Sequence, residues 1–120
     1  MKLLIVDDSS VVRRKIERSV MRSLVEVVGS AANGRQAIEI AAQKRPDIVT
    51  LDLTMPEMDG LQCIDGILEI VPHARILVIS ALADKATALE TLKKGAQGFL
   101  CKPFSDDELN DSLVELIYGQ

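Results

Sequence analysis

The sequence has few of the residues that mark several large classes of protein. Its aromatic side chains are two phenylalanines and one tyrosine among 120 residues, so the core has to be built from aliphatic side chains. No apolar run approaches the ~20 residues that a membrane-spanning helix needs. The first apolar run, from Leu3 to Val6, is too short for a signal peptide and is followed directly by the acidic residues Asp7 and Asp8. We therefore expect no membrane insertion and a cytoplasmic location.

Positive charge and cysteine are also scarce. Lysine and arginine number 14 against 18 aspartates and glutamates, for a net charge of -4. This balance disfavours direct binding to nucleic acid or to an anionic membrane, which needs clustered positive charge, and favours a protein or small-anion partner. The two cysteines, Cys63 and Cys101, fit no metal-ligand spacing. We expect thiols that are packed like small apolar residues.

The chain alternates short β-branched runs with longer segments of helical period. At 120 residues it has the size of one domain, residues 1–120. The alternation is typical of βαβ units and predicts an α/β fold with a parallel sheet of five strands and five helices. The predicted strands are residues 3–6, 25–31, 48–51, 76–79 and 98–101.

Capping residues and apolar spacing predict the helices. The first begins after Ser9 or Ser10, and the last follows Ser105 with Glu108 completing a capping box. The others are predicted over residues 34–44, from Gly60 onward, and over residues 84–94. The residues expected to face the sheet are Val12, Ile16, Val20, Ala37, Ile38, Ala41, Leu61, Ile64, Leu68, Leu109, Leu113 and Leu116.

Polar side chains follow four of the predicted strands. Asp7 and Asp8 follow the first strand, Asp52 the third, Ser80 the fourth and Lys102 the fifth. The carboxyl ends of parallel strands lie along one edge of a sheet, where open α/β folds place their ligands. We therefore expect three carboxylates, a hydroxyl and an ammonium to meet in one crevice.

This set of groups suits a divalent cation and a phosphoryl group. Three acids about 5 Å apart repel one another by roughly 3 kcal/mol a pair at an effective dielectric near 20, so the cluster needs either a cation or protonation. Mg²⁺ takes oxygen ligands and binds one or two carboxylates beside a phosphate, and a carboxylate can attack phosphorus. Each residue also has a plainer interpretation: Asp7 and Asp8 as helix-terminal acids, Lys102 as a solvent-exposed lysine, and Ser80 as a turn residue.

Four segments carry a resemblance to a known family over essentially the whole chain. They are residues 4–9 (LIVDDS), residues 51–60 (LDLTMPEMDG), residues 78–81 (VISA) and residues 102–104 (KPF). Because these four segments occur in this order at the ends of the predicted strands, the chain resembles the receiver domain of two-component response regulators. The resemblance implies a flavodoxin-like, doubly wound fold with strand order 2-1-3-4-5.

The resemblance also implies a role for each acid. Asp52 matches the residue that accepts a phosphoryl group from a histidine kinase or a His-containing phosphotransfer domain, in a reaction that requires Mg²⁺. Asp8 matches the direct metal ligand and Asp7 the acid that holds metal-bound water. Thr54 matches the position whose backbone carbonyl completes the metal coordination. The protein would then be a signalling protein that catalyses only its own phosphorylation and dephosphorylation.

The remaining matches concern the phosphoryl contacts and the output. Lys102 and Ser80 match the residues that hold the phosphoryl oxygens, and the Lys102–Pro103 bond is expected to be cis. Phe99 matches the aromatic switch position, whose plainer interpretation is a core aromatic. The implied output surface for a downstream protein effector includes Lys93, Lys94, Phe99 and Val114.

Two further expectations concern charged side chains outside this site. The basic face of the first helix borders the site and could help dock the phosphodonor, although a solvated face explains it equally well; it carries Arg13, Arg14, Lys15, Arg18 and Arg22. His73, the one histidine, is expected to be an exposed loop residue far from the crevice rather than a phosphodonor.

Several alternatives remain open from the sequence. The favoured interpretation is a stand-alone, monomeric chemotaxis-like or phosphorelay regulator, because the chain begins at Met1 and ends just after its last helix. A receiver cut from a longer regulator with a DNA-binding or enzymatic domain would look the same. More distant alternatives are a small Mg²⁺-dependent phosphohydrolase, which usually has a second acid at the position of Thr54, and a flavin-binding protein, whose phosphate Asp7 and Asp8 would repel.

Overall fold

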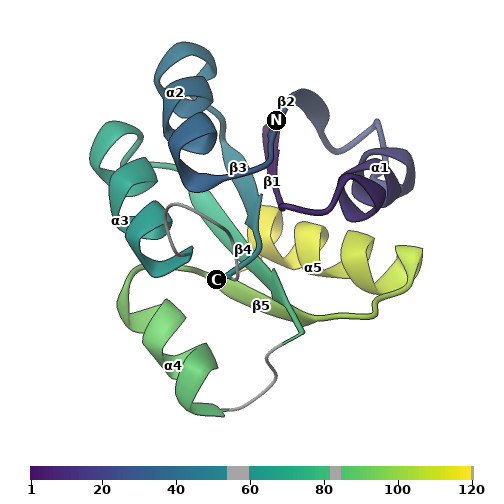
Figure 1. The fold of residues 1–120 in the computed structure, drawn as a ribbon. Helices are drawn as coiled ribbons and strands as arrows, with labels where there is room; N and C mark the ends of the chain where they lie inside the picture. The colour runs from purple at the N-terminus through teal and green to yellow at the C-terminus, as the bar shows by residue number, and fades with distance from the viewer. Residues whose placement is uncertain (54–59, 82–84, 120) are drawn as a thin grey trace.

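The computed structural model describes residues 1–53, 60–81 and 85–119, which form one parallel sheet flanked by helices (Figure 1). The five strands lie in the order β2-β1-β3-β4-β5, as predicted. Along the chain the elements are β1 (Lys2–Val6), α1 (Ser10–Ser19), β2 (Glu26–Ala31), α2 (Gly34–Lys44), β3 (Ile48–Leu51), α3 (Gly60–Ile70), β4 (Arg75–Ser80), α4 (Lys85–Lys93), β5 (Gly98–Cys101) and α5 (Asp106–Tyr118).

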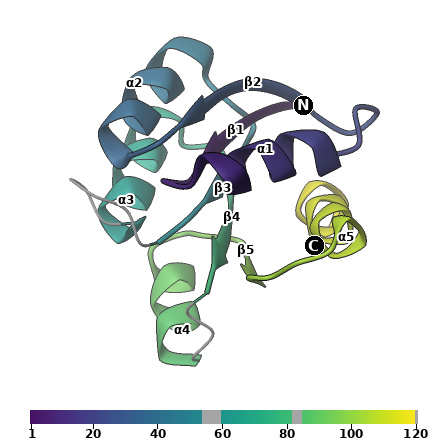
Figure 2. The same cartoon turned by 45° about the vertical axis from the view of Figure 1, so that its right-hand side comes forward.

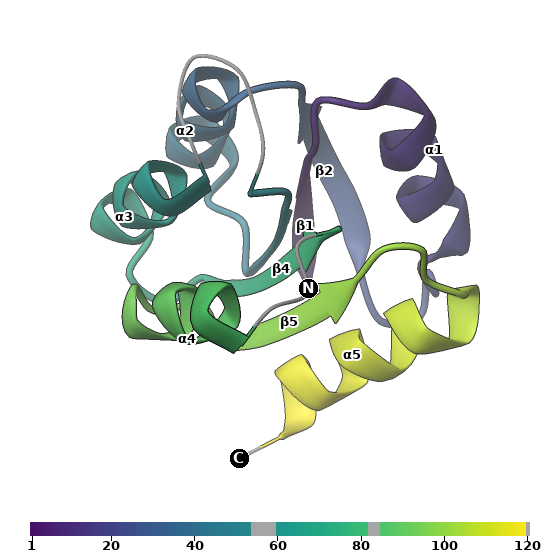
Figure 3. The same ribbon diagram turned by 60° about the horizontal axis from the view of Figure 1, so that its bottom comes forward.

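The helices cover both faces of the sheet, so the fold has three layers. α1 and α5 lie on one face, and α2, α3 and α4 lie on the other (Figure 3). Each face has its own aliphatic core: Leu3 and Ile5 of β1 point towards α1 and α5, whereas Leu4 and Val6 point the other way. This alternation is what a strand buried on both faces requires. The predicted α/β architecture is confirmed.

Capping residues define the helix ends that the sequence predicts. The Ser9 hydroxyl accepts a hydrogen bond from the Val12 backbone N–H at the start of α1. Ser105 and Glu108 form the expected reciprocal capping box at the start of α5. α4 begins at Lys85 in the described chain, and its predicted first residue, Asp84, lies outside the described residues.

The core is wider at α3 than the sequence pattern predicts. Ile64 is fully buried as expected, but Leu61 and Leu68 are only partly buried, while Cys63 and Ile67 have no exposed surface. The cause is that α3 packs against α2 as well as against the sheet: a Cβ atom at Gly66 would lie 2.5 Å from the Ile38 side chain. A helix that packs against both a sheet and another helix buries a broader face than a helix that packs against the sheet alone.

The other inward faces follow the prediction more closely. Val12 and Ile38 are partly buried, and the remaining expected residues of α1, α2 and α5 are buried. The prediction for Cys101 is wrong: this residue is exposed, because it ends β5 at the edge of the sheet. His73 is exposed as expected, with its Nε2 atom 3.7 Å from Asp47 Oδ1. Within the described ranges, none of the helices has the length and apolar character needed to cross a membrane.

Candidate functional site

The register of the sheet brings the polar strand ends to one edge. Val6 of β1 pairs with Leu51 of β3, and Ser80 of β4 pairs with Cys101 of β5. Asp7 follows the end of β1, Asp52 follows the end of β3, and Lys102 follows the end of β5. The backbone continues to pair at these positions: Asp52 N–H donates to the Val6 carbonyl at 2.9 Å, and Lys102 N–H donates to the Ser80 carbonyl at 2.9 Å.

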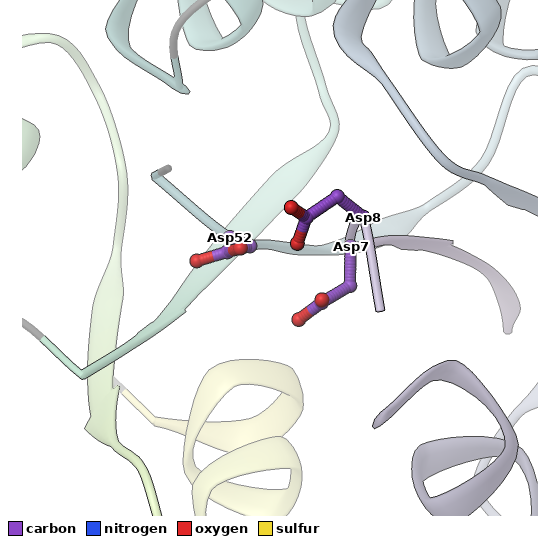
Figure 4. Close-up of side chains that lie close together, drawn as sticks. All are labelled: Asp7, Asp8 and Asp52. Atoms are coloured by element: carbon purple, nitrogen blue, oxygen red, sulfur yellow. The ribbon is translucent and has the colours of Figure 1, made fainter. Parts of the chain in front are cut away.

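Three carboxylates form the centre of the site. One oxygen from each of Asp7, Asp8 and Asp52 lies within 4.8 Å of the others (Figure 4). Asp7 and Asp52 are 1% and 5% exposed, whereas Asp8 is exposed to solvent. At this spacing each pair of ionised acids repels by roughly 3 kcal/mol. The sequence therefore predicted this grouping and its spacing correctly.

Lys102 provides the positive charge nearest to the buried acids. Its Nζ atom lies 2.8 Å from Asp7 Oδ2 and 3.7 Å from Asp52 Oδ1. The side chain is only 21% exposed, so the ammonium points into the site rather than into solvent. The plainer interpretation of Lys102 as a solvent-exposed lysine is therefore wrong. The Lys102–Pro103 peptide bond is cis, as the resemblance implies.

Asp7 is held by its surroundings on three sides. Its Oδ1 atom accepts a hydrogen bond from the Ser9 backbone N–H at 2.9 Å, while Oδ2 receives Lys102. Its backbone carbonyl accepts a hydrogen bond from Arg13 Nη1 at 2.6 Å. Asp7 is therefore a fixed anion in the site, and Asp8, on the exposed side, is the acid most open to an incoming cation.

The basic face of α1 divides into two groups in the structure. Arg13 contacts the Asp7 carbonyl, and Lys15 donates a hydrogen bond to the Phe104 carbonyl. Arg14 and Arg18 are exposed on α1. The prediction that Arg22 lies on this helix is wrong, because α1 ends at Ser19 and Arg22 is an exposed residue of the following turn. Sequence reasoning missed the two inward contacts, because helical spacing places Arg13 and Lys15 on the polar side of α1 but does not show that loops from β1 and β5 reach that side.

The remaining predicted site residues lie near the same edge or outside the described chain. Ser80 is 1% exposed and ends β4, in register with Cys101 just before Lys102. Phe99 is partly buried on β5 and packs against the core on the α2 and α3 side. Thr54 lies outside the described residues.

The donor set of this site suits a hard divalent cation. Its candidate ligands are carboxylate oxygens, which Mg²⁺ prefers, and one of the three acids is open to solvent, so that bound water could complete an octahedron. The repulsion among the acids would become attraction to the ion. Beside the cluster, the Lys102 ammonium lies where it could contact an anionic group transferred to Asp52.

Comparisons with known proteins agree with this geometry. The family described as "Response regulator receiver domain" matches residues 3–114. The chemotaxis protein CheY of Thermotoga maritima is 41% identical over 112 residues, which are 93% of this chain and 93% of that protein. The protein-glutamate methylesterase/protein-glutamine glutaminase of Archaeoglobus fulgidus is 42% identical over 104 residues, 86% of this chain but only 30% of that enzyme.

A solved structure shows the same likeness in three dimensions. The CheX-CheY-BeF3-Mg complex of Borrelia burgdorferi contains a chain that superposes with a TM-score of 0.91 at 32% identity, covering 100% of this chain and 90% of that one. Domains of this kind therefore make up nearly the whole of some proteins and a minor part of others.

Proposed function

Because this chain belongs to the response regulator receiver family, we propose that Asp52 accepts a phosphoryl group from a histidine kinase or a His-containing phosphotransfer domain. The observation that supports this proposal best is the position of Asp52. It is a buried carboxylate with two further acids within 4.8 Å and an ammonium 3.7 Å away. A carboxylate and a phosphoryl group are both anionic, so transfer to Asp52 needs positive charge close to both groups.

Each residue of the site has a separate task in this proposal. Asp7, Asp8 and Asp52 would hold Mg²⁺, with the Thr54 carbonyl as a further predicted ligand. When bound, the ion supplies positive charge that offsets the phosphoryl oxygens. A carboxylate oxygen of Asp52 forms a bond to phosphorus while the bond from phosphorus to the donor histidine nitrogen breaks. Lys102 donates to a phosphoryl oxygen, so its contact with Asp7 would weaken as transfer proceeds.

Ser80 and Phe99 would couple phosphorylation to an output surface. The Ser80 hydroxyl would donate to a phosphoryl oxygen, and Phe99 would move into the space that opens behind it. Helices α4 and α5 flank the edge strand β5 (Figure 2). Each of them exposes two large apolar side chains, which favours protein binding: Leu89 and Leu92 on α4, and Val114 and Tyr118 on α5. With Lys93 and Lys94, this surface would bind a downstream protein effector, as in chemotaxis or a phosphorelay.

The exposed part of α1 would help dock the phosphodonor protein. Arg13 supports the Asp7 backbone, so reversing its charge would disturb the site itself. Arg14 is exposed on the same helix and gives the cleaner test. Arg14→Glu should slow transfer from a kinase while leaving transfer from acetyl phosphate unchanged. An unchanged rate from the kinase would refute docking through Arg14. The cytoplasmic location and the monomeric state stay predictions.

The phosphoacceptor is tested by incubation with acetyl phosphate or beryllofluoride, with and without Mg²⁺. The parent should take up a single phosphoryl group, or bind beryllofluoride, only when Mg²⁺ is present, and Asp52→Asn should not respond. Asp111→Asn, which alters an exposed acid on α5, is the matched control and should respond like the parent. A response that survives in Asp52→Asn would place the acceptor elsewhere. Continuous turnover of phosphate esters would instead indicate a phosphohydrolase.

A further inference from the structure

Lys15 on α1 makes two contacts with one residue of a distant loop. Its Nζ atom donates a hydrogen bond to the backbone carbonyl of Phe104 at 2.5 Å, across 89 residues of chain. The same ammonium lies 4.5 Å from the centroid of the Phe104 ring. A lysine whose only role was to solvate the helix surface would keep its ammonium in water. Both contacts instead direct the charge of Lys15 onto the connection between β5 and α5.

This connection is the segment that carries Lys102. Phe104 is the second residue after Lys102, and the residue is 5% exposed within the core between the sheet, α1 and α5. The next residue, Ser105, caps α5. The segment is therefore fixed at Lys102 by the sheet and at Ser105 by the helix cap. Between these two points, Lys15 binds the Phe104 backbone carbonyl.

The position of the Lys102 ammonium depends on this backbone. A lysine side chain has four flexible carbon–carbon bonds, so its ammonium reaches a defined point only when its main chain is fixed. Here that point is 2.8 Å from Asp7 and 3.7 Å from Asp52. On the other side of this ion pair, Arg13 donates to the Asp7 carbonyl at 2.6 Å. Helix α1 thus binds the backbone on both sides of the contact between Asp7 and Lys102.

We propose that Lys15 is a positioning residue for phosphoryl transfer, which acts by fixing the Phe104 backbone and thereby aiming the Lys102 ammonium at Asp52. The proposal rests on the proposed function, in which Asp52 is the phosphoacceptor. Among the described residues, Lys15 forms no ion pair with Asp7, Asp8 or Asp52, and its polar contacts are with Phe104. Small displacements of a charged group that stabilises a transition state lower the rate steeply. Loss of Lys15 should therefore slow transfer without removing any group of the site.

The first test compares rates of phosphorylation by acetyl phosphate at saturating Mg²⁺. Lys15→Met keeps an unbranched side chain one atom shorter than lysine but removes the donor and the charge, and should lower the rate roughly tenfold. Lys15→Arg keeps both and should restore the rate to within about twofold of the parent. Lys44→Met removes an exposed ammonium at the end of α2 and should match the parent. The Lys44 carbonyl accepts a hydrogen bond from Lys2 at the start of β1, so Lys44 lies at the opposite end of the sheet from the site. A parent-like rate in Lys15→Met would overturn the proposal.

A salt series separates positioning from a general effect of charge. If Lys15 acted only through its long-range field, the difference between Lys15→Met and the parent would disappear near 1 M salt, where the Debye length is about 3 Å. A displaced Lys102 predicts that the ratio of the two rates stays the same across the series. Disappearance of the difference would overturn the proposal. Thermal unfolding is measured first, and if Lys15→Met does not fold, Lys15→Gln replaces it under the same criteria.

A second readout needs neither metal nor phosphodonor. In the metal-free parent, the ion-paired Lys102 ammonium should give its own nitrogen resonance, assigned by its loss in Lys102→Met. That resonance should shift or broaden in Lys15→Met and return in Lys15→Arg, and an unchanged resonance would overturn the proposal.

Asp52→Asn distinguishes a failure of the proposed function from a failure of the proposed role of Lys15. If the parent and Asp52→Asn are phosphorylated alike, the proposed function fails; if only the parent is phosphorylated and Lys15→Met equals it, only the role of Lys15 fails.

Discussion

The Nζ atom of Lys102 lies 2.8 Å from Oδ2 of Asp7, closer than to any oxygen of Asp52, whose Oδ1 is 3.7 Å away. Both partners are largely buried: the Asp7 side chain is 1% exposed and that of Lys102 is 21% exposed. The lysine therefore neutralises part of the negative charge of the acid cluster. A cation that enters the site has to compete with an ammonium already in place.

This competition gives a prediction for Lys102→Met. Removing the ammonium takes away a positive charge beside the acids, and a unit charge about 4 Å away is worth roughly 4 kcal/mol at an effective dielectric of 20. Even a third of that value would tighten Mg²⁺ binding about tenfold. Isothermal titration calorimetry measures the change. Lys44→Met should bind Mg²⁺ like the parent, and an affinity in Lys102→Met that is equal or weaker would contradict the competition.

Asp8 and Asp7 should respond in opposite ways to neutralisation, because their surroundings differ. Asp8 is exposed, so Asp8→Asn relieves repulsion at little cost and should raise the melting temperature of the metal-free protein by about 2–5 °C. It should also reduce the extra stability that Mg²⁺ confers on the parent. Differential scanning calorimetry with and without Mg²⁺ measures both effects.

Asp7→Asn provides the contrast for this experiment. Asp7 is buried and bound to Lys102, so its neutralisation leaves a largely buried ammonium without its nearest carboxylate. Breaking one side of such a pair destabilises a protein. We therefore expect Asp7→Asn to lower the melting temperature of the metal-free protein. A rise in Asp7→Asn equal to that in Asp8→Asn would show that repulsion among the acids outweighs the ion pair.

The fold and the acid cluster could be predicted because both depend on local pattern. Alternating β-branched runs and helical segments give strand and helix order, and parallel strands put their carboxyl ends on one edge. Asp7 and Asp52 therefore had to lie close together once the strands were placed. The capping box at Ser105 and Glu108 is also local, since its two residues are three apart in the chain.

The contacts that could not be predicted are between groups far apart in the chain. The bond from Lys15 to the Phe104 carbonyl depends on the path of a loop and on the angle at which α1 crosses the sheet. Neither leaves a pattern in the sequence. Cys101 was mispredicted for a related reason, because an apolar strand sequence does not show where an edge strand leaves the core. The role of Thr54 stays a prediction, because this residue lies outside the described residues.

Gly60 places the start of α3 directly against the residue after Asp52. Its N–H donates to the Leu53 carbonyl at 2.9 Å, and a Cβ atom at Gly60 would lie 2.5 Å from the Leu53 Cα atom. Since backbone cannot move aside as a side chain can, Gly60→Ala should cost about 1–3 kcal/mol of stability. It should also slow phosphorylation by displacing Asp52. Denaturant unfolding and acetyl phosphate kinetics measure the two effects.

Gly66→Ala is the matched control for Gly60→Ala. A Cβ atom at Gly66 would also meet an atom at 2.5 Å, but that atom is Cδ1 of Ile38, the far end of a flexible side chain. The gain of about 1 kcal/mol in helix propensity offsets part of the crowding. Gly66→Ala should therefore be less destabilised than Gly60→Ala, and acetyl phosphate should phosphorylate it at the parent rate. Equal losses in both variants would show that crowding of α3 in general, and not the contact with Leu53, is responsible.

Ser80 tests whether phosphorylation and output can be separated. In the proposed switch, the Ser80 hydroxyl transmits the arrival of a phosphoryl group to Phe99. Ser80→Ala should therefore still bind beryllofluoride with Mg²⁺, but the amide resonances of β5, α4 and α5 that shift in the parent should stay near their unbound positions. Two-dimensional NMR titration measures both outcomes in one experiment.

Thr50 supplies the control for the loss of a buried hydroxyl. It lies on β3, is 1% exposed, and within the described part of the chain its Oγ1 atom has no hydrogen-bond partner. Thr50→Val keeps the shape and removes the polar atom, so it should leave stability unchanged or raised. Its response to beryllofluoride should match that of the parent.

If Ser80→Ala shows the full parent response at α4, β5 and α5, the signal reaches the output surface without the Ser80 hydroxyl. If Thr50→Val also loses the response, the effect of Ser80→Ala reflects general damage to the sheet instead of a specific switch.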